Sequence, residues 1–163
     1  MSLRRSGTVR RALISAFLLG MIAVGPACSS SSTSGTSDKA EPLGTFTLAG
    51  PTFGTHTLYP KRCASGERQY FLGFDFTDEA EGIVARLVVD PTGVPVVRVF
   101  STAAPFDKTI VFRRTECRVF HFSVDSTGWR INRIDQLSVS LDVDCDLPSG
   151  DRIAGKAQDS GCL

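Results

Sequence analysis

The chain has 163 residues, of which 42% are hydrophobic and 21% are charged, and its 18 basic and 17 acidic side chains give a net charge of +1. This balance excludes the strongly basic surface on which nucleic-acid binding depends. The length and the apolar fraction are typical of one domain with a buried core.

The first 27 residues follow the order of an export signal: four arginines, an apolar run over residues 12–24, and small residues before a cleavage position. The apolar run is shorter than the roughly 20 residues that an α-helix needs to cross a bilayer, so we expect no permanent transmembrane helix. We expect cleavage after Ala27, which makes residues 1–27 a signal peptide. Removing four of the 18 basic residues and no acidic ones leaves 14 against 17, a net charge of −3.

The first residue after that cleavage position is Cys28, and a tract rich in Ser, Thr and Gly follows it. This arrangement resembles a bacterial lipoprotein signal, in which the cysteine carries acyl chains such as palmitate. The resemblance implies lipidation of Cys28 and an anchor in a membrane of the cell envelope, because two or three acyl chains hold a protein where one binds only marginally. We expect residues 28–42 to form a flexible tether, since they have few apolar side chains to offset the entropy of ordering. Plain secretion is the alternative.

Residues 43–163 predict a single β domain. Apolar side chains alternate with polar ones, or run together between turn residues, over residues 71–76, 82–90, 94–100, 117–125, 129–134, 136–145 and 152–158. Turn residues at 91–93, 126–128 and 148–150 separate neighbouring strands. Because no helical period persists over the length of a helix, we expect an all-β fold, an antiparallel sandwich or partly closed barrel of about eight strands.

Alternation also predicts which side chains face the core, because successive side chains of a strand point to opposite faces. The segment 136–145 alternates most regularly. The apolar sets that we expect to share a core face are Leu137, Val139, Leu141 and Val143 in one strand, Leu72, Phe74 and Phe76 in a second, and Phe120, Phe122 and Val124 in a third.

Four cysteines follow Cys28 in the chain, namely Cys63, Cys117, Cys145 and Cys162. An even number in an exported chain predicts two disulfides, because the compartment is oxidising. Their wide spacing lacks the paired CxxC motifs that zinc prefers. Three pairings are possible. A hairpin at residues 148–150 disfavours Cys145 with Cys162, because it places Cys145 near the turn and Cys162 far from it.

The stretch from Cys63 to Val99, with glycines at 66, 73 and 82, resembles the core of the mycobacterial LpqH-type lipoprotein antigens. The turn at residues 125–128 before a strand and the closing Cys162 also match that family. The resemblance implies a surface-exposed lipoprotein with no catalytic residues to transfer. It further implies a Cys63–Cys162 disulfide, which leaves Cys117 with Cys145. In a regular strand those two would lie on different faces, so their bond needs a bulge or twist near Cys117.

Two groups of side chains have the residue types of a known functional site, but neither has the spacing that the site requires. His121, Ser123 and Asp125 are the residue types of a nucleophilic triad, but in one strand each lies nearly 7 Å from the next, whereas a triad needs contacts near 3 Å. Three aspartates at 142, 144 and 146 begin like a calcium loop, but the required Gly and Glu are missing downstream. We therefore expect no catalytic residue and no metal ligand. Basic runs at 61–62 and 113–118 are the candidates for an anion site.

These patterns together predict a non-enzymatic, envelope-anchored lipoprotein whose β domain has a structural role or binds another macromolecule. We expect no cofactor and no nucleic-acid partner. The expected partners are the membrane, through the lipid anchor, and a protein or other envelope component. The alternative function is a carrier of an apolar small molecule or lipid in a cavity between the sheets, which the many phenylalanines suggest.

Overall fold

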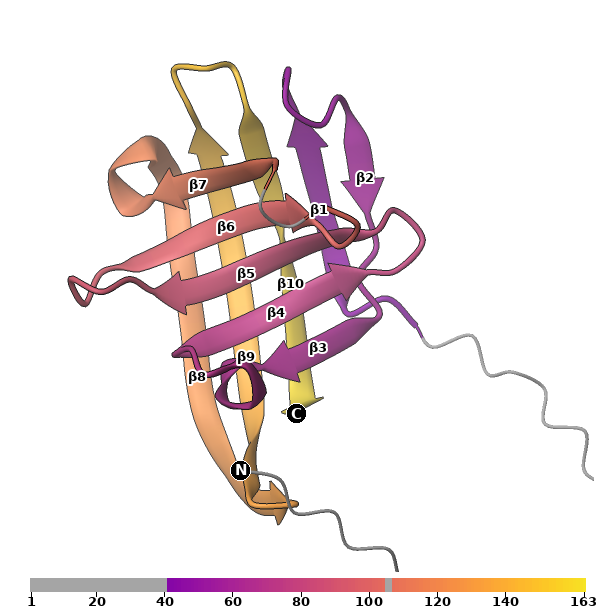
Figure 1. Cartoon of the computed structure of the whole chain (residues 1–163), viewed down its shortest axis with the longest axis vertical. Coiled ribbons are helices and arrows are strands. Elements are labelled where there is room, and N and C mark those ends of the chain that lie inside the picture. The colour runs from indigo at the N-terminus through magenta and orange to yellow at the C-terminus, as the bar shows by residue number, and fades with distance from the viewer. Residues whose placement is uncertain (1–40, 105–106) are drawn as a thin grey trace, which may run out of the picture. The chain divides into compact units, whose positions relative to one another are not determined.

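A computed structural model of the protein describes residues 41–104 and 107–163 (Figure 1). The predicted signal peptide and Cys28 lie outside these residues. The described chain forms ten β-strands and two short 3-10 helices, η1 (Gly66–Gln69) and η2 (Arg114–Glu116). Within it, no helix has the length and hydropathy that a membrane crossing requires.

The ten strands form two antiparallel sheets of five strands each. Sheet A has the order β2 (His56–Leu58), β1 (Gly44–Ala49), β10 (Arg152–Cys162), β9 (Ile134–Asp146) and β8 (Cys117–Ile131). Sheet B has the order β3 (Arg62–Ser65), β4 (Gly73–Asp78), β5 (Ile83–Val89), β6 (Pro95–Ser101) and β7 (Thr109–Arg113). The sheets lie face to face with their strands crossing (Figure 1), so the predicted sandwich is confirmed and the barrel alternative is not observed.

The core lies between the two sheets and is built by the inward side chains of their strands. The alternation predicted for residues 136–145 is confirmed, because Val139, Leu141 and Val143 are at most 2% exposed. The largest side chains of the core are phenylalanines from both sheets, which are also almost fully buried: Phe46, Phe74, Phe76 and Phe112. Burying one such side chain stabilises a fold by roughly 1.5–3 kcal/mol, so these phenylalanines make a large contribution to stability.

Two expectations about core-facing side chains are wrong, each for its own reason. Leu72 is 73% exposed because it precedes β4, and Phe122 and Val124 are 39% and 43% exposed although Phe120 is buried. Their register partners on β9, Leu141 and Val139, are buried, so at these positions the core covers β9 but not the edge strand β8. Farther along, the β8–β9 hairpin extends beyond sheet B (Figure 1). Alternation assigns a side chain to a face of the strand, but burial also requires an opposing sheet at that position.

The β8–β9 hairpin is longer than the sequence suggests. Residues 126–128 do not end the strand, because pairing resumes at Arg130 with Asp135 after a register shift. Three residues of β8 lie opposite one of β9 there, and Gly128 takes a positive φ of 80°. The turn lies instead at Asn132 and Arg133, with φ of 53° and 70°. The predicted break is therefore a β-bulge inside a 15-residue strand.

Both expected disulfides form. Cys63 in β3 joins Cys162 in β10, and Cys117 in β8 joins Cys145 in β9. This is the pairing that the family resemblance implies. The register of β8 shifts by one residue between Cys117 and Val119, so Arg118 is the bulged residue that turns Cys117 toward Cys145. The first bond covalently links sheet B to sheet A, whereas the second lies within sheet A.

Asp151 links two loops that are far apart in the sequence. Its carboxylate accepts hydrogen bonds from the Thr52 backbone N–H at 3.0 Å, the Thr52 hydroxyl at 2.9 Å and the Ser149 hydroxyl at 2.9 Å. Burial by itself raises the pKa of this carboxyl, but these hydrogen bonds outweigh burial and hold the pKa below its ordinary value. Asp151 thereby ties the β9–β10 turn to the β1–β2 loop.

We expect the two disulfides to contribute unequally to stability. Closing a loop with a sequence separation of 99 residues stabilises by about 4.7 kcal/mol on a chain-entropy argument, and closing one of 28 residues by about 3.5 kcal/mol. Replacing Cys63 and Cys162 by Ala should therefore lower the free energy of unfolding more than replacing Cys117 and Cys145. Urea unfolding of both double variants measures this, and the reverse order would contradict it.

Asp151→Asn should lower the free energy of unfolding at pH 7 by about 1–3 kcal/mol, because the neutral amide loses the charge-assisted hydrogen bonds. The folded-state pKa of Asp151 is depressed, so this stabilisation is complete above about pH 4 and is lost as the pH falls through the folded-state pKa. Urea unfolding at pH 7 and pH 3 should show the difference shrinking at low pH. Asp125→Asn, at an exposed side chain without a described hydrogen bond, is the control.

Candidate functional site

Strand β8 is a long edge strand. It pairs only with β9, so one side of its backbone has no sheet partner within the described residues. Every residue from 121 to 126 is exposed. Proteins usually blunt such edges with charges, bulges or a covering segment, because unpaired N–H and C=O groups attract another strand. The two bulges of β8 lie toward its ends and leave residues 119–126 in regular register with β9.

The side chains along this free edge present two different surfaces. Phe122 and Val124 are partly exposed on the core side, where sheet B no longer covers them. His121, Ser123 and Asp125 stand on the outer face, as the sequence predicts. The hydroxyl of Ser123 shares a 2.8 Å hydrogen bond with that of Ser140, and none described joins it to His121. The triad residues thus line a strand face without contacting one another.

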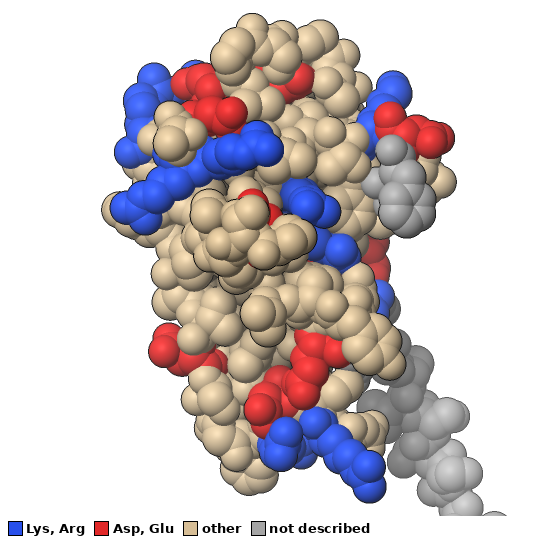
Figure 2. Space-filling model, turned by 60° about the vertical axis from the view of Figure 1, so that its left-hand side comes forward, with Lys and Arg blue, Asp and Glu red and all other residues tan. Residues whose placement is uncertain are grey.

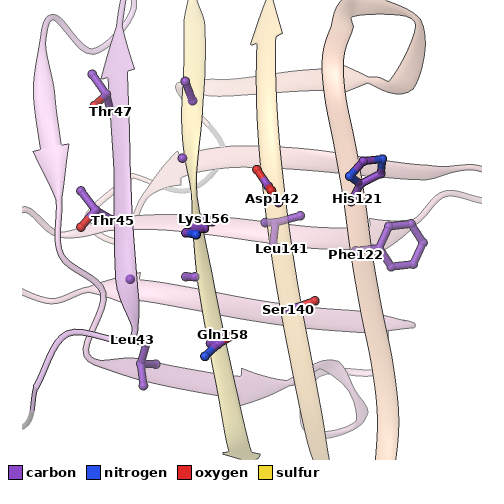
Figure 3. A pocket seen from close by; sticks show the side chains of 14 residues that line it. Leu43, Thr45, Thr47, His121, Phe122, Ser140, Leu141, Asp142, Lys156 and Gln158 are labelled. Atoms are coloured by element: carbon purple, nitrogen blue, oxygen red, sulfur yellow. The ribbon is translucent and has the colours of Figure 1, made fainter.

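A hollow of about 790 Å³ adjoins β8 on the outer face of sheet A (Figure 3). Thr45, Lys156, Asp142 and His121 cross it as one row of register-paired residues on four strands. Small residues form its floor. Gly155 has a φ of 139°, and a Cβ there would lie 2.2 Å from the Thr45 carbonyl oxygen, so the β1–β10 backbones can approach only because this residue is glycine.

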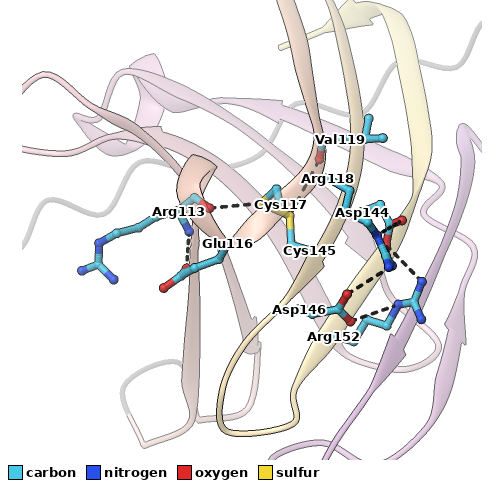
Figure 4. Close-up of a disulfide and its surroundings, with 9 residues drawn as sticks. All are labelled: Arg113, Glu116, Cys117, Arg118, Val119, Asp144, Cys145, Asp146 and Arg152. Carbon is cyan, nitrogen blue, oxygen red and sulfur yellow. Dashed lines mark hydrogen bonds and ion pairs between the residues drawn. A yellow bond between two sulfur atoms is a disulfide. The ribbon is translucent and has the colours of Figure 1, made fainter.

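The acidic end of β9 does not form a cation site, because two arginines neutralise it (Figure 4). Arg118 donates to both carboxylate oxygens of Asp144 at 3.0 Å and contacts Asp146 at 3.1 Å. Arg152 contacts the same two carboxylates at 3.1 and 3.4 Å. The hydrogen bonds from Arg118 lower the pKa of Asp144. The bulge at Arg118 therefore serves both the disulfide and this ion-pair network.

One group of metal-type ligands occurs in the described part of the chain. Ligand atoms of Cys63, Asp159 and Cys162 lie within 4.8 Å of one another. The two sulfur atoms are bonded to each other, so neither is a thiolate, and a thiolate is the form that binds zinc. This group is a disulfide with a neighbouring carboxylate.

Charges on the β8 side of the molecule are grouped. Figure 2 shows this side: basic and acidic side chains lie next to one another in groups, with uncharged surface between them. Mutual neutralisation of this kind leaves no large field of one sign on this face. Net charge therefore offers little basis for recognition on this face, in contrast to hydrogen-bonding groups and apolar side chains.

Comparison with protein-family models, with curated proteins and with solved structures finds no match to this chain. The likeness to LpqH-type antigens therefore stays a prediction from the sequence.

The sequence patterns did not identify a cluster of charged side chains on the outer face of sheet B. Asp75, Arg86 and Arg98 are neighbours there, in the centre of strands β4, β5 and β6. Burial raises the pKa of Asp75, and its hydrogen bonds from Arg86 oppose that rise. A signal was present, since each arginine interrupts an apolar run, "IVARLVV" and "PVVRVF", on either side of a predicted turn. Counting back from that turn places the two arginines opposite each other.

Proposed function

We propose that the protein is a non-enzymatic, lipid-anchored protein of the cell envelope whose β domain binds a polypeptide partner along the free edge of β8. The observation that carries this proposal is the 15-residue edge strand, in which residues 121–126 are all exposed. An extended segment of a partner can add to such an edge as a further strand, with backbone hydrogen bonds providing affinity and alternate side chains providing specificity.

The surroundings of β8 suit an added strand. A partner strand would place its side chains alternately against Phe122 and Val124 on one face and against Ser123 and the neighbouring hollow on the other. The exposed apolar side chains supply burial on binding, at roughly 25 cal/mol per Å² of apolar surface. The outer face supplies hydroxyl, carboxylate and imidazole groups for hydrogen bonds.

The envelope location is supported by two independent features. The protein has two disulfides. Disulfides persist in oxidising compartments and are rare in reducing ones. Cys28, with the Ser-rich and Thr-rich tract after it, has the arrangement of a lipid attachment site, and it lies outside the described residues. A domain tethered in this way can present β8 to partners within the same envelope.

The alternative of a carrier with a cavity between the sheets is not favoured. The space between the sheets is filled by side chains such as Phe74, Phe112 and Leu141, which are completely buried. The three hollows described in the molecule involve residues of outer faces and loops. An apolar ligand would have to displace packed core side chains, which costs several kcal/mol.

Lipidation is tested by replacing its acceptor. The wild-type chain expressed in a bacterium with a lipoprotein pathway should partition into the detergent phase and incorporate labelled palmitate. Cys28→Ser should partition into the aqueous phase and incorporate no label, because the hydroxyl is not an acceptor for the diacylglycerol group. Cys28→Ser that still partitions into detergent would contradict the anchor.

Partner binding is tested by photo-crosslinking in intact cells. A photoreactive phenylalanine analogue at position 122 or 124 should give adducts that contain a polypeptide, because these side chains border the free edge. The same analogue at Thr57, an exposed position of the short edge strand β2, is the matched control and should give none. Equal adducts at all three positions, or none at 122 and 124, would contradict the proposal. An adduct of twice the chain mass would identify a second copy as the partner.

A further inference from the structure

The outer face of sheet B, which faces the viewer in Figure 1, holds a buried ion pair. Arg86 donates from Nε and Nη2 to the two carboxylate oxygens of Asp75, both at 2.7 Å, and from Nη2 to Gln69 at 2.6 Å. The ring centroids of Phe71 and Phe100 lie 4.1 and 5.0 Å from its guanidinium carbon. These contacts hold the Arg86 guanidinium in one plane, and the ion pair with Arg86 neutralises the charge of Asp75.

Arg98 lies directly opposite Arg86 in the β5–β6 register and lacks a counter-charge. Its Nε is buried and has no hydrogen-bond partner, and within the described residues its guanidinium makes no ion pair. Like charges directly opposite each other in a sheet are destabilising, and an unsatisfied buried donor adds to that cost. A bound anion would relieve both costs.

A hollow of about 690 Å³ surrounds these two arginines. Its charged lining consists of Arg62, Arg86 and Arg98 against the single carboxylate of Asp75. Because Arg62 also pairs with Glu79 at 3.5 Å, the excess positive charge of the hollow is that of Arg98. Hydroxyl and apolar side chains, Thr77 and Phe100 among them, complete the wall. The hollow therefore combines excess positive charge with donors and an apolar side.

We propose that this hollow binds an oxyanion, a carboxylate or phosphate group, with the Arg98 guanidinium as its principal partner. Arg86 is the second partner, because the described contacts of its guanidinium occupy Nε and Nη2 and leave Nη1 free. Arginine is suited to this role because its planar fork matches two oxygens of a carboxylate or phosphate. A phosphate group and the carboxylate of a sugar acid are the two forms of oxyanion that the experiment compares. The site belongs to sheet B and is independent of β8 in sheet A.

The experiment compares thermal unfolding of the full-length exported chain in detergent at constant ionic strength, with sodium chloride replaced stepwise by sodium phosphate or by sodium galacturonate. The melting temperature should rise with at least one of these anions. A rise with phosphate alone shows that the hollow prefers a phosphate group, and a rise with galacturonate alone shows that it prefers a carboxylate. No rise with either overturns the proposal.

Arg98→Gln separates this site from a general salt effect. The variant should melt at the same or a higher temperature than the wild type in chloride, because the opposed charge is gone, and its affinity for the anion should fall at least tenfold. Arg114→Gln, at an exposed arginine of η2, should keep the wild-type response. An unchanged anion response in Arg98→Gln overturns the proposal. If the variant does not fold, NMR of the wild type during the same titration replaces it. A shift of the Arg98 Nε–H resonance on adding the anion supports the site, and an unchanged resonance overturns it.

Discussion

The covalent bond between Cys63 and Cys162 is the constraint on which the arrangement of the molecule depends. It joins the edge strand of sheet B to the last strand of sheet A across 99 residues of sequence. A chain of this size buries its apolar surface only when two sheets face each other. The bond closes a long loop between the two sheets and so lowers the conformational entropy of the unfolded chain. The phenylalanine-rich core then fills the enclosed space.

Because the inner faces are committed to the core, recognition falls to the outer faces and edges. Sheet A offers a polar outer face and the long free edge of β8, where charges are largely neutralised within ion pairs. Sheet B offers the opposite character, an arginine-lined hollow with an uncompensated guanidinium. The two proposed surfaces, one for strand pairing and one for anion binding, therefore lie on different sheets. Neither requires the core to open.

Particular elements show how far sequence patterns carry. The strand at residues 136–145 is predicted correctly because it alternates without interruption and has one wet face. The strand at 117–131 is divided wrongly, since a Ser-Thr-Gly bulge has the composition of a turn and only its hydrogen-bonding partner distinguishes the two. The exposure of Phe122 is missed because a pattern identifies a face and not the length of the opposing sheet. Arg98 is passed over because a lone arginine in an apolar strand has meaning only beside Arg86 and Asp75.

By itself, the sequence determined the all-β class, the positions of six of the ten described strands, two of the hairpin turns and the presence of two disulfides. These properties follow from local chemistry, namely two-residue alternation, turn-forming residues and an even number of cysteines. Only the tertiary structure decided the order of the strands in each sheet and which side chains the opposing sheet covers. It also decided that β8 lies at an edge of its sheet and which carboxylate each arginine contacts. Those outcomes depend on which distant segments meet. The free energy of such a contact depends on both segments, so the sequence of either one alone does not predict it.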